Sequence, residues 1–299
     1  MTDTLKLGLE WFLNPDHLPF LIGLEKGWFE AAGVALELVA PTEHLDAFDA
    51  IRTGALDLAI TEPIHLVEDV AKGHEVVGFA RLLHTNGGVM TLESSGIERP
   101  RDMAGKRIQY PGAPGPGGLA IVSTMIEADG GEPGTLTPVN RGFHHTDALI
   151  EGAADAATLA FYNFEIVEAG HRGHPARLFA LKDWGIPDFC QLILITTRER
   201  YAAKRAALRR LIEVVGRGMD FIHQHPDEAR ALYFRRTETD PDDVLMSAIF
   251  RATVPCFTFD LTMSGAYWRG LSSWAARRGL IEAAVAPEAC WNNDLVVSA

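Results

Sequence analysis

A carboxylate and a histidine stand three residues apart at Glu62 and His65, within the stretch "AITEPIHL" (residues 59–66). An apolar run that is typical of a strand ends at Thr61, and Pro63 suits the first turn of a following helix. A carboxylate beside an imidazole can transfer protons as a general acid–base pair, and the same groups can hydrogen-bond a polar ligand. We therefore interpret Glu62 and His65 as ligand contacts first and as an acid–base pair second.

Polar and aromatic residues also follow the other strand-like runs "LKLGL", "KRIQY" and "AATLA". Carboxylates and amides can hydrogen-bond ring amines, and flat aromatic side chains can stack on a heteroaromatic ring. We expect Trp11 and Tyr162 to sandwich such a ring. The candidate ligand-binding residues are Glu10, Trp11, Asn14, His17, Thr61, Glu62, His65, Tyr110, Gly112, Phe161, Tyr162, Asn163, Glu165 and Asp188.

The eleven histidines give little support to a metal site. No pair has the helical i, i+4 ligand spacing together with a carboxylate, so no metal is expected. The stretch that contains His144 and His145 is interpreted as a polar loop before a helix, with Thr146 as the helix cap. Lys182 follows a strand-like run and is expected to face solvent rather than to form a Schiff base.

The composition is that of an acidic globular chain of 299 residues. Its formal net charge of −13 disfavours nucleic acid and anionic membranes as partners, because both repel an acidic surface. No apolar run reaches the roughly 20 residues that cross a bilayer, and three scattered cysteines form no disulfide framework. The start "MTDTLKLGLEW" lacks a secretion signal, so we expect a cytoplasmic protein as written, or a periplasmic one if a signal peptide has been omitted.

Strand-like and helix-like segments alternate over the first hundred residues. Strands are expected at residues 5–9, 34–40 and 55–60, and helices at 18–32, 45–53 and 63–72. This alternation predicts right-handed crossovers and a mostly parallel sheet in an α/β fold. From Arg198 onward the pattern is helical, with a long amphipathic run that is interrupted near Pro226.

An internal repeat indicates that the chain contains two related α/β lobes. Residues 49–57 read "DAIRTGALD" and residues 147–155 read "DALIEGAAD". In each copy the pattern predicts a helix that ends at glycine and a strand that follows within three residues. Each predicted strand is then followed by a polar and aromatic cluster, "TEPIH" in the first copy and "FYNFE" in the second.

The position of these clusters predicts where a ligand would bind. Ligands of open parallel sheets lie outside the carboxyl ends of the strands, and two lobes that present such ends to each other form a cleft. We place the chain crossings near Asn86 and Thr196. Residues 1–86 and 197–299 would then form lobe 1, and residues 87–196 would form lobe 2.

Several stretches together resemble a known family. They are "LEWFLNPDHLPFLIGLEKGWFEAAGVALELVAPTE", "GALDLAITEPIH", "AGKRIQYPG" and "LILITTRERYAAKRAALRRLIEVVGRGMDFIHQHPDEA". They are similar to the family that contains the fungal thiamin-pyrimidine synthases and the bacterial binding proteins for thiamin-pyrimidine precursors. The resemblance implies an α/β, two-lobed type II periplasmic-binding-protein fold, with two hinge crossings and a ligand cleft between the lobes.

The chain departs from the synthases of that family at three chemical positions. Thr61 stands where they carry the lysine that holds pyridoxal phosphate, although His65 matches their reacting histidine four positions on. A Schiff base needs an amine, which threonine lacks. Cys190 stands alone where the synthases have a cysteine cluster, and "GAPGPGG" (112–118) lacks the lysine of their phosphate loop. We therefore expect no cofactor and no synthase reaction.

These observations predict a binding protein for a small heteroaromatic, pyrimidine-like molecule. It would be the solute-binding component of an ABC-type uptake system, with an ABC permease as its partner, or a cytoplasmic relative. The alternative is a cytoplasmic enzyme of thiamin-pyrimidine or other heteroaromatic metabolism, in which His65 and Glu62 transfer protons.

Overall fold

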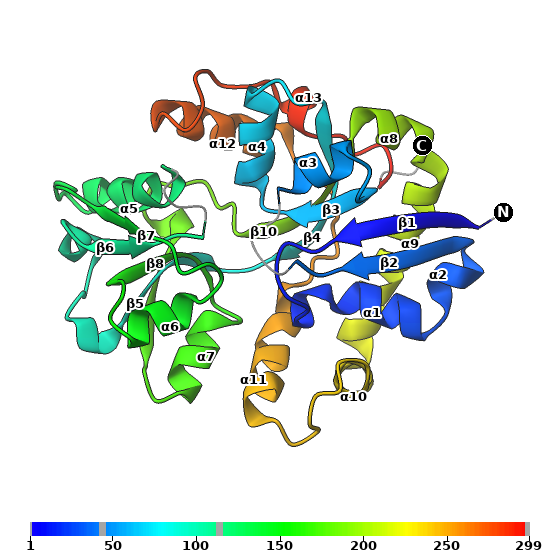
Figure 1. Cartoon of the computed structure of the whole chain (residues 1–299), viewed down its shortest axis with the longest axis horizontal. Helices are drawn as coiled ribbons and strands as arrows, with labels where there is room; N and C mark the ends of the chain where they lie inside the picture. Colours follow the sequence, from blue (N-terminus) through cyan, green and yellow to red (C-terminus); the bar gives the residue numbers. More distant parts are fainter. Residues whose placement is uncertain (1, 42–45, 112–115, 297–299) are drawn as a thin grey trace. The chain divides into compact units, whose positions relative to one another are not determined.

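The computed structural model describes residues 2–41, 46–111 and 116–296, and it divides into two compact units (Figure 1). Unit 1 comprises Met1–His84, Gln191–Ser272 and Ala283–Ala299. Unit 2 comprises Thr85–Cys190 and Ser273–Glu282. None of the described helices is both long enough and apolar enough to cross a membrane.

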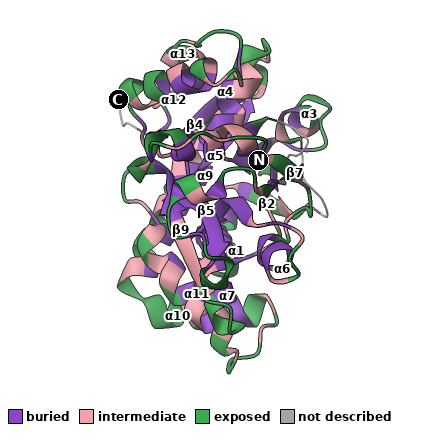
Figure 2. Ribbon diagram, turned by 90° about the vertical axis from the view of Figure 1, so that its left-hand side faces the viewer, coloured by how far each residue is buried: buried purple, intermediate pink, exposed green. Residues whose placement is uncertain are grey.

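Unit 1 is built on a five-stranded mixed sheet with the order β2-β1-β3-β10-β4. Strand β1 is parallel to β2 and β3, whereas β10 is antiparallel to both of its neighbours, β3 and β4. The strands are β1 (Asp3–Gly8), β2 (Val34–Val39), β3 (Leu58–Thr61), β4 (Val76–His84) and β10 (Gln191–Thr197). The strands are rich in Leu, Val and Ile because both faces of the sheet are covered. Figure 2 shows β4 largely buried.

Helices cover both faces of this sheet (Figure 1). One face packs on α1 (Leu18–Glu25), α2 (Trp28–Ala31) and α9 (Arg205–Gln224), and the other on α3 (Ala47–Arg52) and α4 (Pro63–Ala71). Helix α10 (Pro226–Arg236) packs on α1 and α9. The remaining helices of the chain's second half are α8 (Arg198–Ala203), α11 (Val244–Thr253), α12 (Gly265–Arg277) and α13 (Pro287–Cys290). Helix α12 begins in unit 1 and ends in unit 2. The interruption predicted near Pro226 is confirmed, because α9 ends at Gln224 and α10 begins at that proline.

Unit 2 repeats the same sheet plan in the order β7-β6-β8-β5-β9. Strand β6 is parallel to β7 and β8, and β5 is antiparallel to β8 and β9. The strands are β5 (Gly87–Leu92), β6 (Arg107–Gln109), β7 (Thr137–Val139), β8 (Ala156–Phe161) and β9 (Ala176–Ala180). Helix α5 (Gly117–Ala128) covers one face, and α6 (His145–Ile150) and α7 (Glu165–His171) cover the other.

The internal repeat predicted from the sequence has the same local geometry in both units. The Asp57 carboxylate accepts the Lys6 backbone N–H at 2.9 Å, and Asp57 N donates to Lys6 O at 2.9 Å. Asp155 makes the same two contacts with Arg107, each also at 2.9 Å. Gly54 and Gly152 end the preceding helices with φ of 85° and 69°, a left-handed conformation that glycine adopts without steric cost.

The unit boundaries differ from those expected. Residues 191–196 were expected in lobe 2, but β10 pairs with β3 and β4 and so belongs to the sheet of unit 1. Residues 273–282 were expected in lobe 1, but they pack in unit 2. The Trp274 ring lies 6.0 Å from that of Phe189, and Arg278 pairs with Glu127 at 2.6 Å.

Two local predictions are wrong. The single helix expected over residues 18–32 is two helices, because Gly27 has φ of 67° and separates α1 from α2. Thr146 does not cap α6, because the helix begins one residue earlier, at His145, and His144 occupies the cap position. Both errors concern where a helix turn begins or ends, which apolar spacing alone defines poorly.

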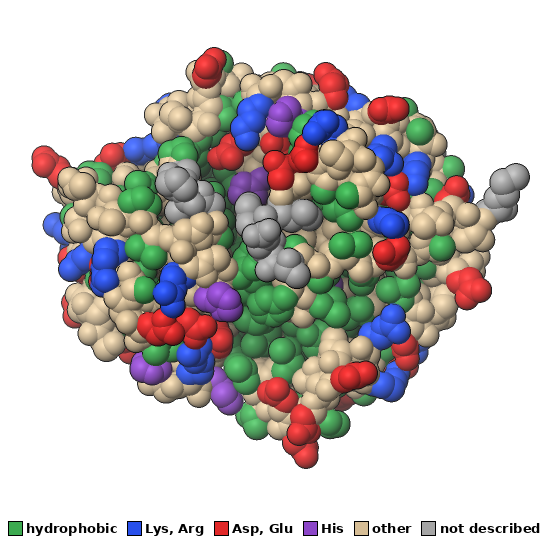
Figure 3. Space-filling model, in the orientation of Figure 1, with side chains coloured by type: hydrophobic (Ala, Val, Ile, Leu, Met, Phe, Trp, Pro, Cys, Tyr) green, Lys and Arg blue, Asp and Glu red, His purple; other side chains and the backbone are tan. Residues whose placement is uncertain are grey.

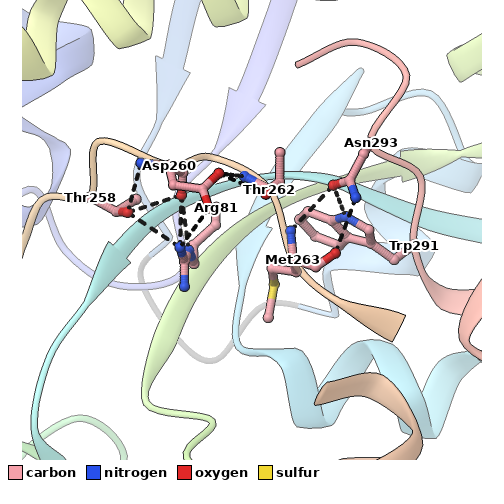
Figure 4. A network of polar contacts seen from close by, with 7 residues as sticks. All are labelled: Arg81, Thr258, Asp260, Thr262, Met263, Trp291 and Asn293. Carbon is pink, nitrogen blue, oxygen red and sulfur yellow. Dashed lines mark hydrogen bonds and ion pairs between the residues drawn. The ribbon is translucent and has the colours of Figure 1, made fainter. Parts of the chain in front are cut away.

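The outer edge of β4 is covered by two segments from the end of the chain. Arg81 donates to Asp260 O at 2.8 Å (Figure 4), and its backbone N–H donates to Leu261 O at 2.9 Å. In the second segment, Asn292 N donates to Gly78 O of β4 at 3.0 Å, and Trp291 Nε1 donates to Asn293 Oδ1 at 2.5 Å. Covering an edge strand satisfies its free backbone groups and prevents pairing with other chains.

Candidate functional site

The ends of strands β1 and β3 lie side by side at one edge of the unit 1 sheet. The strands are parallel, and Gly8 pairs with Ala59. The chain leaves β1 towards Glu10 and leaves β3 towards Glu62, each a few residues beyond these paired positions. The fold therefore brings together two polar segments that are about fifty residues apart in the sequence, as expected at the carboxyl ends of parallel strands.

Glu10 and His17 form the first of two carboxylate–imidazole pairs at this edge. His17 Nε2 lies 3.1 Å from both oxygens of Glu10. His17 is completely buried, and the Glu10 side chain is 10% exposed. Asn14 is also completely buried; its Oδ1 accepts Asp16 N at 2.8 Å, and its Nδ2 donates to Phe12 O at 3.1 Å. Asn14 and His17 therefore support the turn between β1 and α1, and their predicted ligand contacts stay untested.

Glu62 and His65 form the second pair. His65 Nδ1 lies 3.1 Å from Glu62 Oε2 and 3.4 Å from Thr61 Oγ1. The side chains of His65 and Glu62 remain 22% and 14% exposed. Burial lowers the pKa of His65, but the hydrogen bond and charge of Glu62 outweigh it and raise the pKa from 6.5 to about 9. At neutral pH this pair is therefore an imidazolium beside a carboxylate.

Two further carboxylates contribute to this environment and were missed from the sequence. Glu68 and Asp69 lie on α4, one turn after His65, and their charges also raise its pKa. Burial raises the pKa values of both carboxyl groups in turn. Figure 3 shows acidic and histidine side chains, with basic ones among them, over α3 and α4. The i+3 and i+4 spacing in "HLVED" was the available signal, since such residues share one helix face.

The aromatic residues that follow β1 are only partly buried. The rings of Trp11 and Phe12 lie 4.3 Å apart and are tilted by 54°. Phe12 is 40% exposed. The predicted sandwich joins Trp11 of unit 1 to Tyr162 of unit 2, and it stays a prediction.

In unit 2, Tyr110 follows β6 and lies beneath the first turn of α5. A Cβ at Gly118 would come within 2.6 Å of Tyr110 Cβ, and a Cβ at Gly117 within 2.8 Å of the Tyr110 hydroxyl. Tyr110 is 9% exposed, so the two glycines are required for its close packing. Gly112 lies outside the described residues.

The residues that follow β8 divide into surface and core. Tyr162 is 52% exposed, whereas Asn163 is completely buried and Glu165 is 2% exposed. Thr85 Oγ1 donates to Asn163 Oδ1 at 3.2 Å. Phe161 is 9% exposed, and its backbone N–H donates to Glu165 Oε2 at 2.8 Å. Tyr162 is therefore the residue of this set that is most available to a ligand.

A backbone irregularity immediately precedes this segment. Leu159 has φ of 57°, which is strained for a branched residue inside a strand. The β5–β8 register passes from Gly88 opposite Ala160 to Val89 opposite Thr158, so Leu159 is the extra residue of a β-bulge. Bulges redirect the residues that follow them and occur often beside functional sites.

The other candidates from the sequence add little to this chemistry. Asp188 is partly buried in unit 2, Lys182 is exposed as expected, and His144 pairs with Asp147 at 3.4 Å. Among the described residues, no group of three or more His, Cys, Asp or Glu side chains is placed to hold a metal ion.

The residues that follow β1 and β3 do not fit pyridoxal phosphate in the way that it is held by the synthases of the family that this chain resembles. Thr61 is 6% exposed, and its hydroxyl faces His65 rather than supplying an amine. Residues 10–17 and 61–65 contain no lysine. We therefore derive no chemistry through that cofactor.

The two mixed five-stranded sheets define a protein of the periplasmic-binding-protein fold. The alkanesulfonate-binding protein SsuA from Xanthomonas axonopodis pv. citri, bound to MOPS, is similar to this chain with a TM-score of 0.76 and 13% sequence identity. The match covers 97% of this chain and 98% of that chain.

More particularly, the chain belongs to the family described as NMT1/THI5 like, which matches residues 14–229. The formylaminopyrimidine-binding protein of Halalkalibacterium halodurans is 27% identical over 76% of this chain and 68% of its own length. The 4-amino-5-hydroxymethyl-2-methylpyrimidine phosphate synthase of Legionella pneumophila is 26% identical over 95% of this chain and 90% of its own length. The family and the periplasmic-binding-protein fold expected from the sequence are thereby confirmed, although both sheets are mixed rather than mostly parallel.

Proposed function

We propose that this chain is a binding protein for a small heteroaromatic ligand that carries amine hydrogen-bond donors, such as an aminopyrimidine. The observation that carries the proposal is that two glutamates, Glu10 and Glu62, follow the neighbouring parallel strands β1 and β3. An ionised carboxylate can accept hydrogen bonds but cannot donate them. It therefore suits a ligand that donates hydrogen bonds.

The family and the fold support this ligand class. Two relatives are named for an aminopyrimidine, one as a binding protein and one as a synthase. The synthase chemistry lacks its amine here, because Thr61 occupies the corresponding position. What remains is a set of hydrogen-bond acceptors in unit 1 with the exposed ring of Phe12, and, in unit 2, the exposed ring of Tyr162.

The partner that we propose is an ABC permease, which would accept the ligand from this chain. The support is the periplasmic-binding-protein fold alone. Co-purification of the chain with the membrane fraction of cells that express a candidate permease, and release on adding ligand-free competitor chain, would test it.

Acid–base catalysis by Glu62 and His65 is the alternative function. At neutral pH the raised pKa keeps His65 protonated, so this residue can donate a proton but is poorly suited to remove one. Sustained conversion of a bound heterocycle by the wild-type chain, lost in His65→Gln with binding retained, would favour the enzyme over the binding protein.

Isothermal titration calorimetry with a panel of heterocycles tests the binding function. We expect saturable binding of 4-amino-2-methylpyrimidine or its 5-substituted derivatives, and no binding of methanesulfonate. Glu62→Gln should weaken aminopyrimidine binding by about 10-fold or more, because a charge-assisted hydrogen bond contributes about 1.5–3 kcal/mol.

Glu37→Gln is the matched control, because this glutamate lies on β2 of the same unit and its side chain is 56% exposed. It removes the same charge without altering the strand ends, so affinity should change less than about twofold. Equal weakening by both substitutions would indicate a general charge effect, and no saturable binding to any aminopyrimidine would defeat the proposal.

A further inference from the structure

Glu10 and His17 belong to a hydrogen-bonded relay that begins at the backbone. The Asn14 N–H donates to His17 Nδ1 at 3.2 Å, and His17 Nε2 faces both oxygens of Glu10 at 3.1 Å. The Asn14 side chain in turn holds the first turn through Asp16 N. The relay is therefore assembled within a single turn of the chain, between β1 and α1.

The backbone donor selects the tautomer of the imidazole. Burial lowers the pKa of His17, but Glu10 raises it more, with a net rise. A proton on Nδ1 would nevertheless oppose the Asn14 N–H, so the geometry accommodates the ring that carries hydrogen on Nε2 only. That ring donates one hydrogen bond to the Glu10 carboxyl group.

One donor cannot saturate a carboxylate, which has about four acceptor positions. Within the part of the chain that the structure describes, His17 is the only hydrogen-bond partner of the Glu10 side chain. The N–H of His17 is equidistant from the two oxygens, so it occupies the space between them and leaves their outer lone pairs. Those positions suit a single N–H from a ligand rather than a bidentate amidinium or guanidinium.

Glu62 differs from Glu10 in the charge of its partner. Glu62 lies beside a protonated His65, whose charge offsets its own. The partner of Glu10 is a buried imidazole whose geometry favours the neutral form. Of the two glutamates, Glu10 therefore keeps the stronger attraction for a donor on the ligand.

We propose that Glu10 selects the amine of the ligand by accepting its N–H, and that His17 is a positioning residue that fixes the Glu10 carboxylate for this contact. This inference rests on the proposed function and deepens it. His17 itself is completely buried and does not touch the ligand. The relay accounts for the residue types at positions 10, 14 and 17 together.

A matched pair of probes tests the selection. In 2,4-dimethylpyrimidine a methyl group replaces the amine of 4-amino-2-methylpyrimidine, so shape is kept and the donor is lost. Calorimetry on the wild-type chain should give an amine-to-methyl affinity ratio of about 10 to 100. Glu10→Gln, which keeps an acceptor for His17 but loses the charge, should reduce the ratio at least fivefold.

Substitution of His17 tests positioning. His17→Gln can still present an N–H to Glu10 and should keep most of the ratio, whereas His17→Phe lacks a donor and should lose it. In a Glu10→Gln background, His17→Phe should cause little further loss of the ratio. Near-ultraviolet circular dichroism checks each variant for folding. If His17→Phe does not fold, the two single variants Glu10→Gln and His17→Gln keep the test decisive.

The outcomes separate this inference from the proposed function. If the wild-type chain binds neither probe, both fail. If it prefers the amine and Glu10→Gln preserves the ratio, selection by Glu10 is overturned while aminopyrimidine binding stands. If His17→Phe weakens both probes equally and leaves the ratio unchanged, His17 is structural and the positioning role is overturned.

Discussion

At the residue scale, two histidines with glutamate partners behave differently because different groups face their rings. His17 is completely buried, and its Nδ1 accepts a backbone N–H, which favours the neutral ring. His65 is partly exposed, its Nδ1 faces Glu62, and further carboxylates on α4 add to that attraction. The same residue type thus supplies a donor whose tautomer is set by a backbone N–H in one place and a cation in the other.

The raised pKa of His65 predicts a pH-dependent stability. The folded protein binds the proton more tightly than the unfolded chain, so the stabilisation is complete below pH 6.5 and is lost as the pH rises through about 9. We expect the free energy of unfolding to fall by about 3 kcal/mol across this window, because each pKa unit corresponds to about 1.4 kcal/mol.

Urea unfolding at a series of pH values checks this prediction. His65→Gln should flatten the decline between pH 6.5 and 9, because the titrating group is gone. His74→Gln, which alters the other histidine that faces Asp69 on this surface, serves as the control and should retain the decline. An unchanged slope in His65→Gln would contradict the assignment.

The sequence predicted both glutamates at the strand ends. It predicted the histidine partner of Glu62 but not that of Glu10. Glu62 and His65 are three residues apart, and a helix starting at Pro63 was enough to pair them. Glu10 and His17 are paired only because a short 3-10 turn, Pro15–His17, folds the chain back onto the end of β1. Turn geometry of this kind depends on capping contacts that residue spacing does not define.

At the element scale, apolar periodicity identified the first three strands of unit 1 and the helices that follow them, but it missed local departures from regular structure. The separation of α1 from α2 depends on one glycine in the left-handed conformation, Gly27. The bulge at Leu159 has no sequence signature, because leucine rarely adopts a positive φ. At Leu159 strand pairing overrides the local preference of leucine, whereas the left-handed turn at Gly27 is a conformation that glycine adopts without steric cost.

Two glycines test the difference between a close backbone contact and a left-handed backbone conformation. Gly88→Ala places a Cβ 2.0 Å from Phe179 O, a backbone atom of the neighbouring strand β9, so β5 and β9 cannot keep their pairing. We expect a loss of stability of about 3 kcal/mol or more. Gly27→Ala meets nothing within 4 Å and should cost only about 1 kcal/mol, the steric cost of a left-handed alanine.

Thermal and urea unfolding of the two variants compare these costs. A smaller loss for Gly88→Ala than for Gly27→Ala would show that the β5–β9 pairing can relax around an added methyl group. Such a result would contradict the close approach at Gly88.

At the scale of the whole molecule, the two sheets repeat one plan within a single chain. In both units the central parallel strand is fixed by an aspartate from the next helix–strand junction, Asp57 in unit 1 and Asp155 in unit 2. The repeat was predicted from nine-residue matches, because glycine and aspartate have fixed roles at that junction. The boundaries of the units were less predictable, because β10 and the end of α12 join units that lie elsewhere in the sequence.

The two aspartates differ in the number of cations that they bind. Asp57 also binds Arg200 at 2.9 Å and Lys204 at 2.7 Å, so it ties helices α8 and α9 to the sheet, and its side chain is 13% exposed. Asp155 binds Arg107 at 2.8 Å, on the strand that it already contacts, and is 28% exposed. Removing the charge of Asp57 therefore leaves two partly buried cations without a counter-charge, whereas removing that of Asp155 leaves one that is more exposed. We expect Asp57→Asn to cost about 2–3 kcal/mol and Asp155→Asn about 1 kcal/mol, measured by urea unfolding at pH 7. Equal costs would mean that the shared backbone contact, rather than the added ion pairs, supplies the stability of both junctions.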